Sequence, residues 1–172
     1  MEEAFRPTPE QYVDYIPTLN VEGAKVIAAA SIVTAVELRV YGSILILSIT
    51  GMQEYSQAFG ASARPAHVDI AGAKATTVLN MRRSTRRLAE WLGAERVGAR
   101  PEDFAGQIKS LLSGGVAIFA DEAQSQFVGA AAFSGGSPEQ DEYICLRGVY
   151  MAGLFSDIPL EESQERLKPK EL

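Results

Sequence analysis

The apolar run Ser43–Ile49 constrains the fold of this chain more than any other segment. It reads Ser-Ile-Leu-Ile-Leu-Ser-Ile, which is far shorter than the roughly 20 apolar residues that a membrane-spanning helix needs. A short run that is continuously apolar and rich in isoleucine is typical of a β-strand buried on both faces. We therefore expect the core to be built around a sheet.

The rest of the sequence alternates between helical and strand patterns. The predicted helices cover about 20–39, 65–79, 86–91, 101–112 and 137–155. The predicted strands cover about 43–49, 55–59, 116–120 and 127–133. Hairpins give antiparallel sheets, and helices must cover them. The order therefore predicts an α+β fold with a four- or five-stranded, mostly antiparallel sheet covered by helices.

Several residues mark where the predicted helices begin and end. Asn20 is a suitable N-cap for the first helix, and Ser84 with Thr85 is suited to cap the helical piece that follows. The tetrapeptide Ser-Pro-Glu-Gln from Ser137 combines an N-cap, a proline at the first helical position and a capping box. Gly114 and Gly115 are expected to end the 101–112 helix.

The length of 172 residues suits one domain with a sizeable core. Prolines among acidic residues predict an N-terminal arm over 1–16, followed by the folded domain over 17–156. The charged stretch 157–172 is expected to be a C-terminal tail.

Charge and composition favour some partners over others. The net charge is −6, which disfavours binding to nucleic acid because an acidic surface repels phosphates. The arginines between Arg82 and Arg87 form one dense basic cluster, and a solvated helix end is a better interpretation of it than a nucleic-acid site. We expect no membrane partner and, because no basic and apolar leader follows Met1, a cytoplasmic location.

Three stretches together are similar to the GlcG/HbpS-like family, also called the haem-degrading or PduO C-terminal-like domain. They are Pro17–Lys25, Val68–Thr77 with Arg83–Thr85, and Gly114–Gly115 followed by the run Ser134–Asp141. The last run, Ser-Gly-Gly-Ser-Pro-Glu-Gln-Asp, is the most specific of the three. The resemblance covers roughly residues 17–155 and implies a small-molecule-binding oligomer.

The resemblance also bears on haem. Haem-binding members of the family use a histidine near the start of the opening helix, and this chain has none there. No cofactor is therefore firmly predicted, and haem affinity is expected to be weak or absent. Iron would have only His67, Cys145 or a tyrosine as a candidate axial ligand, and no spacing typical of a metal site is present.

Six residues are candidates for a functional site. His67, the only histidine, and Asp141 are the candidate catalytic residues, since both can exchange protons. Lys74, Ser134, Gly135 and Gly136 are the candidate ligand-binding residues. A lysine supplies positive charge, and a glycine turn before a helix exposes amides that favour an anion. These groups predict a small ligand that is acidic.

Each candidate also has a structural interpretation. His67 could be a first-turn surface histidine, Lys74 could form an interface salt bridge, and Asp141 could bond the amides of its own turn. The glycines could simply permit the turn. Cys145 fits a buried apolar role better than a nucleophilic one, because no base partner is evident.

Three functions follow from these interpretations. The first is a small-molecule-binding homo-oligomer, with a pocket near a subunit interface and a ligand related to haem or another small acid. The alternative is a cofactor-independent lyase or isomerase that acts on a small organic or aromatic acid by acid/base chemistry. The third is a structural subunit of a larger complex. The alanine-rich face of the 68–79 helix, which suits close packing on a sheet or a subunit, motivates the homo-oligomer.

Overall fold

A computed structural model describes residues 19–94 and 106–168 of the chain. Within them it contains, in chain order, α2 (Val21–Glu37), β1 (Gly42–Ser48), β2 (Gln53–Phe59), α3 (Pro65–Met81), α4 (Thr85–Ala94), β3 (Gly115–Phe119), β4 (Phe127–Ser134), α5 (Pro138–Met151) and α6 (Leu160–Leu167). The strands form one sheet in the order β2-β1-β4-β3, and every neighbouring pair is antiparallel. The predicted α+β class and the antiparallel four-stranded sheet are confirmed.

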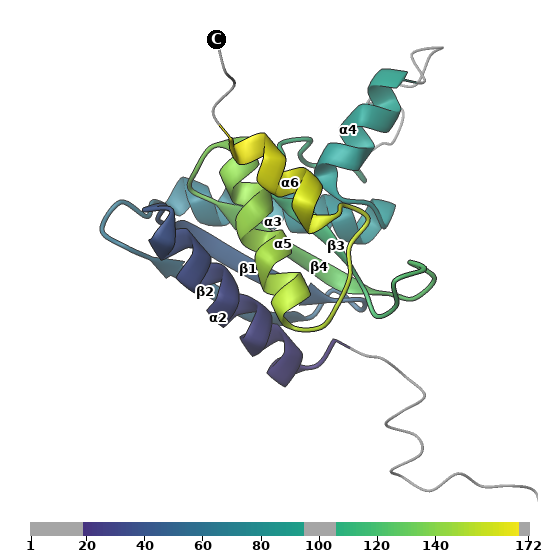
Figure 1. Ribbon diagram of the computed structural model, residues 1–172, viewed down its shortest axis with the longest axis horizontal. Helices are drawn as coiled ribbons and strands as arrows, with labels where there is room; N and C mark the ends of the chain where they lie inside the picture. The colour runs from purple at the N-terminus through teal and green to yellow at the C-terminus, as the bar shows by residue number, and fades with distance from the viewer. Residues whose placement is uncertain (1–18, 95–105, 169–172) are drawn as a thin grey trace, which may run out of the picture.

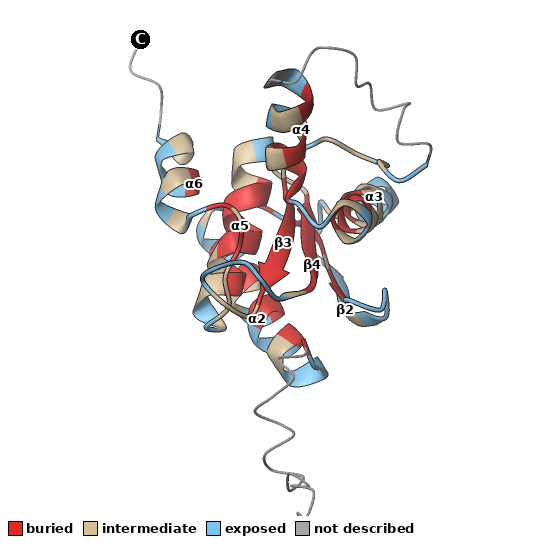
Figure 2. Cartoon of the chain, turned by 90° about the vertical axis from the view of Figure 1, so that its right-hand side faces the viewer, coloured by how far each residue is buried: buried red, intermediate tan, exposed pale blue. Residues whose placement is uncertain are grey.

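Helices cover both faces of this sheet. Figure 2 shows the sheet nearly edge-on, with α5 on one side and α3 on the other. One core cluster joins α2 and α5 to one face, and a second cluster joins α3 to the other. β1 is buried along almost its whole length, as the apolar run Ser43–Ile49 predicts. Small residues of β4, Ala130 to Ala132, let the helical layers approach closely and are fully buried.

Two of the predicted helix caps, at Asn20 and Ser137, form as expected. Asn20 accepts a hydrogen bond from the Gly23 amide at the start of α2. Ser137 and Gln140 form the reciprocal capping box at the start of α5. α5 ends at Met151, four residues before the predicted end, and Phe155 instead forms an isolated bridge with Phe119.

The outer edge of β3 is sealed. The amides of Gly115 and Ala117 donate to the hydroxyls of Thr85 and Ser84, and the Phe119 amide donates to the Phe155 carbonyl. Ser84 and Thr85 were expected to cap a helix, but their side chains satisfy the backbone of a strand instead. The hydrogen-bond donors of this edge are thus taken up by neighbouring segments of the same chain.

The helix predicted over 101–112 is wrong for the described part, 106–112, while residues 101–105 lie outside the described residues. The amides of Lys109 and Ser110 donate to the hydroxyl of Thr77 on α3, and the Gln107 carbonyl accepts from Asn80. These tertiary bonds replace the hydrogen bonds of a helix, so packing overrides the amphipathic pattern.

Part of the expected C-terminal tail is also helical. Leu160–Leu167 form α6, which packs on α5, and Ser163 in its middle is fully buried. The charges that suggested a solvated tail find partners, since Glu162 pairs with arginines of α4 and Arg166 with glutamates of α5. Figure 1 shows α6 lying across α5 near the base of α4.

Candidate functional site

The six candidate residues predicted from the sequence lie around one cavity of about 230 Å³, where the first turns of α3 and α5 meet the turn after β4. Its lining residues are His67, Ile70, Lys74, Leu112, Ser113, Ser134, Gly135, Gly136, Pro138 and Asp141. The structure therefore brings all six together, although they come from segments about 70 positions apart in the chain.

Lys74 and Asp141 form a buried ion pair at this cavity. The Lys74 ammonium donates to Asp141 Oδ2 at 2.8 Å and to the Phe133 carbonyl at 2.8 Å. Lys74 is only 1% exposed. Burial raises the pKa of Asp141 above its ordinary value, and the Lys74 charge only partly opposes this. The sequence left two interpretations of Lys74 open, ligand binding and a salt bridge at a subunit interface. The structure shows a salt bridge, but its partner Asp141 belongs to the same chain.

The second oxygen of Asp141 is also occupied. Oδ1 accepts a hydrogen bond from the Gly136 amide at 2.8 Å. The turn before α5 therefore already holds a carboxylate of its own, which takes the place of the external anion expected there. Gly135 has a steric role as well, because a Cβ at this position would lie 2.3 Å from the Tyr41 carbonyl oxygen.

Gly114 belongs to the site, although the sequence was interpreted as using it to end a helix. Its φ of +107° lies in a region that side chains avoid, and an added Cβ would lie 2.6 Å from Asp141 Cβ and 2.9 Å from Lys74 Nζ. The chain thus passes directly against the ion pair. The Gly-Gly dipeptide was visible in the sequence. Its contact with Asp141 and Lys74 was not, because these residues come from distant segments of the chain.

His67 lies at the third position of α3, where its side chain takes part in a capping arrangement. The Arg64 backbone amide donates to His67 Nδ1 at 3.2 Å. Nδ1 is therefore the unprotonated nitrogen, and the neutral ring carries its proton on Nε2. In this state His67 can offer a hydrogen-bond donor to the cavity, but no free lone pair.

Cys145 lies near this site but is not a usable nucleophile. It is fully buried on α5, and its thiol lies 3.6 Å from the Gly114 carbonyl oxygen. Burial strongly raises the pKa of the Cys145 thiol, so the reactive thiolate is not formed near neutral pH. The predicted structural role of Cys145 agrees with this environment.

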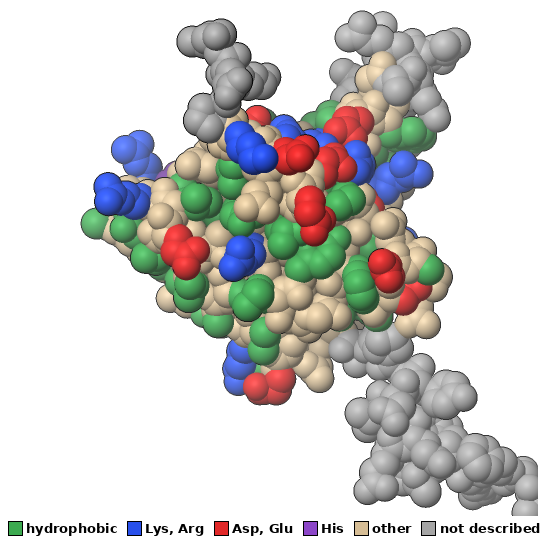
Figure 3. All heavy atoms as spheres, viewed as in Figure 1, with side chains coloured by type: hydrophobic (Ala, Val, Ile, Leu, Met, Phe, Trp, Pro, Cys, Tyr) green, Lys and Arg blue, Asp and Glu red, His purple; other side chains and the backbone are tan. Residues whose placement is uncertain are grey.

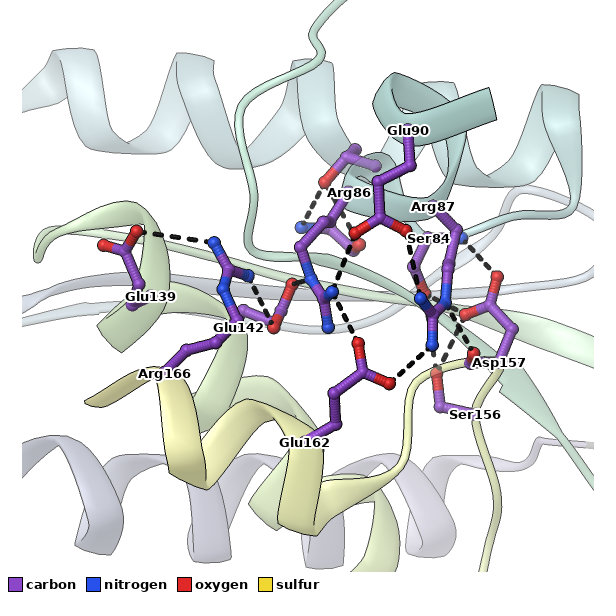
Figure 4. Close-up of polar contacts among 12 residues, drawn as sticks. Ser84, Arg86, Arg87, Glu90, Glu139, Glu142, Ser156, Asp157, Glu162 and Arg166 are labelled. Atoms are coloured by element: carbon purple, nitrogen blue, oxygen red, sulfur yellow. Dashed lines mark hydrogen bonds and ion pairs between the residues drawn. The ribbon is translucent and has the colours of Figure 1, made fainter. Parts of the chain in front are cut away.

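A second polar cluster ties α4 to α5 and α6 (Figure 4). Arg86 is only 8% exposed and pairs with Glu142, Glu90 and Glu162, while Arg87 pairs with Glu90 and Glu162. Burial disfavours the charge of Arg86, but the hydrogen bonds to these carboxylates outweigh it and raise its pKa. The interpretation of the arginine cluster as a solvated helix end is therefore wrong for Arg86, although Arg82 and Arg83 are exposed.

Two classes of site find no support in the described residues. Within 19–94 and 106–168, no group of three or more His, Cys, Asp or Glu side chains could hold a metal ion. In the same ranges, no helix has both the length and the apolar character needed to cross a bilayer.

Solved structures with similar folds support the observed architecture. A PduOC–haem complex is 23% identical with a TM-score of 0.69, and the match covers 81% of this chain and 98% of that one. The protein ORFY of Klebsiella pneumoniae is 19% identical with a TM-score of 0.68, and the match covers 89% and 97% of the two chains. HbpS is 20% identical with a TM-score of 0.63, and the match covers 87% and 94%.

Sequence comparison identifies the family. No curated protein sequence matches the chain significantly. A family model described as haem degrading protein HbpS-like matches residues 19–150, which include the cavity and its ion pair. Since this match spans most of the chain, the protein belongs to the HbpS-like family.

Proposed function

We propose that this protein binds a small molecule in the cavity between α3 and α5. The observation that carries the proposal is the convergence of His67, the Lys74–Asp141 pair and the 134–136 turn on one cavity wall. Polar groups that converge beside apolar side chains, here Ile70 and Leu112, are typical of small-molecule sites.

The charges around the cavity define the class of ligand. Asp141 neutralises Lys74, so the wall does not carry the net positive charge that an acidic ligand would require. What the wall offers is hydrogen-bond donors, namely the Nε2 proton of His67 and the hydroxyls of Ser113 and Ser134. We therefore propose a small uncharged organic ligand that presents a carbonyl oxygen to His67.

The family and its haem-bound relative PduOC raise the question of haem. Haem iron needs a lone pair from its axial ligand. The cap bond from Arg64 leaves Nε2 of His67 protonated, and a cavity of about 230 Å³ is below the roughly 300 Å³ from which ligand sites usually start. His67 and its surroundings therefore do not fit axial ligation, and we expect weak haem binding or none.

Binding fits the site better than the alternative of acid/base catalysis by His67 and Asp141. A lyase or isomerase of this kind needs groups that exchange protons with the substrate. Both oxygens of Asp141 already accept hydrogen bonds from Lys74 and Gly136. Asp141 is thus committed to positioning the cavity wall.

We also propose that the cavity lies near a subunit boundary. Leu112 lines the cavity and is 55% exposed. A second copy that covered this leucine would bury apolar surface and narrow the open side of the cavity at the same time.

Ligand-observed NMR of the full chain tests the binding function. The probes are benzamide, nicotinamide and acetamide, uncharged molecules that each carry an acceptor oxygen. We expect at least one of them to bind, and His67→Ala to weaken it by about tenfold, since a hydrogen bond to a ligand contributes roughly 1.4 kcal/mol. Val68→Ala, the neighbouring change outside the cavity, should have no effect.

Two results would overturn the proposal. One is that none of the probes binds. The other is binding that His67→Ala leaves unchanged. Haem is tested separately by titration with haemin, for which a sharp Soret shift at one-to-one stoichiometry that His67→Ala abolishes would contradict the expectation of weak binding.

A further inference from the structure

A second and larger cavity, of about 480 Å³, lies at the opposite end of α3 from His67. It is lined chiefly by Arg82, Arg83, Arg87, Phe119, Phe127 and Asp157. Its volume lies within the roughly 300–1,000 Å³ that small-molecule sites occupy. About 15 helical residues separate Arg82 from His67, so the two cavities are roughly 20 Å apart along the helix.

The three arginines that line this cavity differ in whether a carboxylate neutralises their charge. Arg87 is committed, because its guanidinium bonds Glu90, Glu162 and the Asp157 carbonyl. Among the described residues, neither Arg82 nor Arg83 forms an ion pair. The side-chain contacts shown for them are with aromatic rings. The cavity therefore carries two guanidinium groups without a carboxylate partner.

The one carboxylate in the wall, Asp157, offsets only part of their charge. Both oxygens of Asp157 are taken up by Ser84, one by its amide at 2.9 Å and the other by its hydroxyl. Asp157 is thereby turned toward the Ser84 segment, and its hydrogen bonds hold that segment in place. An anion that enters this cavity meets more positive than negative charge.

The aromatic residues give the cavity a second property. Phe119 is buried and contacts the ring of Phe127 edge-on, with centroids 5.7 Å apart. The guanidinium of Arg82 lies over the Phe127 ring at 5.9 Å from its centroid, and that of Arg83 lies over Trp91 at 5.5 Å. Planar guanidinium groups held against rings leave their edge N–H groups available for a carboxylate.

The backbone at Arg82 supports this placement. Arg82 has a φ of 51°, in the left-handed region, and its amide donates to the Val78 carbonyl as it ends α3. This conformation is uncommon for a residue other than glycine. It turns the chain sharply between α3 and α4, so that Arg82, Arg83 and Arg87 border the same cavity.

From these observations we infer that the cavity bordered by Arg82 and Arg83 is a binding site for an aromatic carboxylate. The carboxylate takes hydrogen bonds from the two unpaired guanidinium groups, and the ring of the ligand packs on Phe127. The positive charge and the aromatic surface could each have a purely structural explanation. A flat organic anion requires both together in a cavity of this size.

Calorimetric titration of the full chain with naphthoate tests the inference. We expect saturable binding, weaker by at least about tenfold in Arg82→Gln and in Arg83→Gln, since a charge-assisted bond contributes more than 1.4 kcal/mol. Arg39→Gln is the matched control, because Arg39 is also an exposed arginine with a positive φ but lies at the end of α2. It should bind naphthoate as the parent chain does.

Two further probes separate the contributions of charge and ring. Naphthamide lacks the charge and should bind at least tenfold more weakly, and inorganic phosphate lacks the ring and should also bind more weakly. Phosphate that binds as tightly as naphthoate would overturn the aromatic part of the inference. Failure of naphthoate to bind, or equal binding to the two variants and the parent, would overturn the inference as a whole.

The result is independent of the function proposed for the other cavity. His67→Ala should leave naphthoate binding unchanged, and the single Trp91 gives one indole resonance that should shift on binding because Arg83 lies over its ring. Naphthoate binding that depends on His67 and not on Arg82 or Arg83 would contradict this inference and locate the naphthoate in the first cavity.

Discussion

The Lys74 ammonium and the Asp141 carboxylate lie 2.8 Å apart and join α3 to α5, two helices that cover opposite faces of the sheet. The pair is buried where β4 ends, and the Phe133 carbonyl and the Gly136 amide complete its hydrogen bonds. A buried pair with this many partners fixes the relative position of the elements that carry it.

Removal of one member of this pair should be strongly destabilising. Lys74→Met leaves the Asp141 carboxylate buried without its counter-charge, which typically costs about 3–5 kcal/mol in the free energy of unfolding. The double variant with Asp141→Leu should recover part of this loss, because no charge is then buried. Chemical denaturation measures both, and a single variant as stable as the parent would contradict the role of the pair.

Arg86 and Arg87 are adjacent but should respond differently to the same change. Arg86→Met leaves Glu142, which is 1% exposed, with only the partly exposed Arg166, and we expect a loss of about 3 kcal/mol or more. Arg87→Met removes contacts at the surface and should cost about 1 kcal/mol or less. Equal losses in thermal or denaturant unfolding would show that burial does not distinguish the two arginines.

Glu162 should make stability fall in acid. Burial opposes its ionisation, but the hydrogen bonds from Arg86 and Arg87 outweigh this and hold the pKa of Glu162 below its ordinary value of 4.5. The unfolded chain therefore takes up this proton first. The stability that the contacts provide is complete above about pH 4.5 and is lost as the pH falls through the folded pKa.

The comparison of Glu162→Gln with Glu165→Gln measures this contribution. Both residues lie on α6, but Glu165 is exposed. Denaturation midpoints taken from neutral pH into the acid range should fall less steeply for Glu162→Gln than for the parent, while Glu165→Gln should follow the parent. Indistinguishable slopes for the two variants would contradict the prediction.

Two glycines should respond in opposite directions to alanine. Gly114→Ala adds a methyl group against Asp141 and Lys74 at a positive φ, so we expect a loss of roughly 2–4 kcal/mol in the free energy of unfolding. Gly72 lies inside α3 with nothing within 4 Å of an added Cβ. Gly72→Ala should stabilise the protein by about 0.5–1 kcal/mol through helix propensity, and a destabilised Gly72→Ala would contradict this interpretation of the helix.

We predict self-association through α2, in addition to the boundary proposed at Leu112 and not through the alanine-rich face that first motivated it. Ala71 and Ala75 of α3 are fully buried against the sheet, so the alanine face is already used within the chain. Figure 3 shows hydrophobic side chains along α2, where Val33 is 58% exposed. Light scattering should give a mass above the 18.5 kDa of one chain, which Val33→Glu should reduce. A monomer at micromolar concentration would contradict the prediction.

The sequence predicts well what is decided within a few neighbouring residues. The capping box from Ser137 and the strand at Ser43–Ile49 depend on local hydrogen bonds and on apolar content, and both form as expected. The candidate residues were chosen for chemistry that suits a single ligand, and in the structure they line one cavity.

Features that depend on distant partners could not be predicted in this way. The Ser84 hydroxyl accepts a hydrogen bond from a strand amide 33 positions away. The Thr77 hydroxyl accepts from the amides of Lys109 and Ser110, which the amphipathic pattern had assigned to a helix. The ionic partners of Arg86 lie up to 76 positions away. No periodicity in the sequence carries these pairings, since they are fixed only when the layers pack together.

The sealed edge of β3 limits how this sheet can grow. Within the described residues, β2 is the outermost strand on the other side, and no further strand pairs with it. If the sheets of two copies pair through their β2 strands, each copy uses its one open edge. The product is a closed symmetric dimer to which no third sheet can be added in the same way. Ser84, Thr85 and Phe155 therefore act as a stop against continuous fibre-like stacking, which would need both edges to accept a strand.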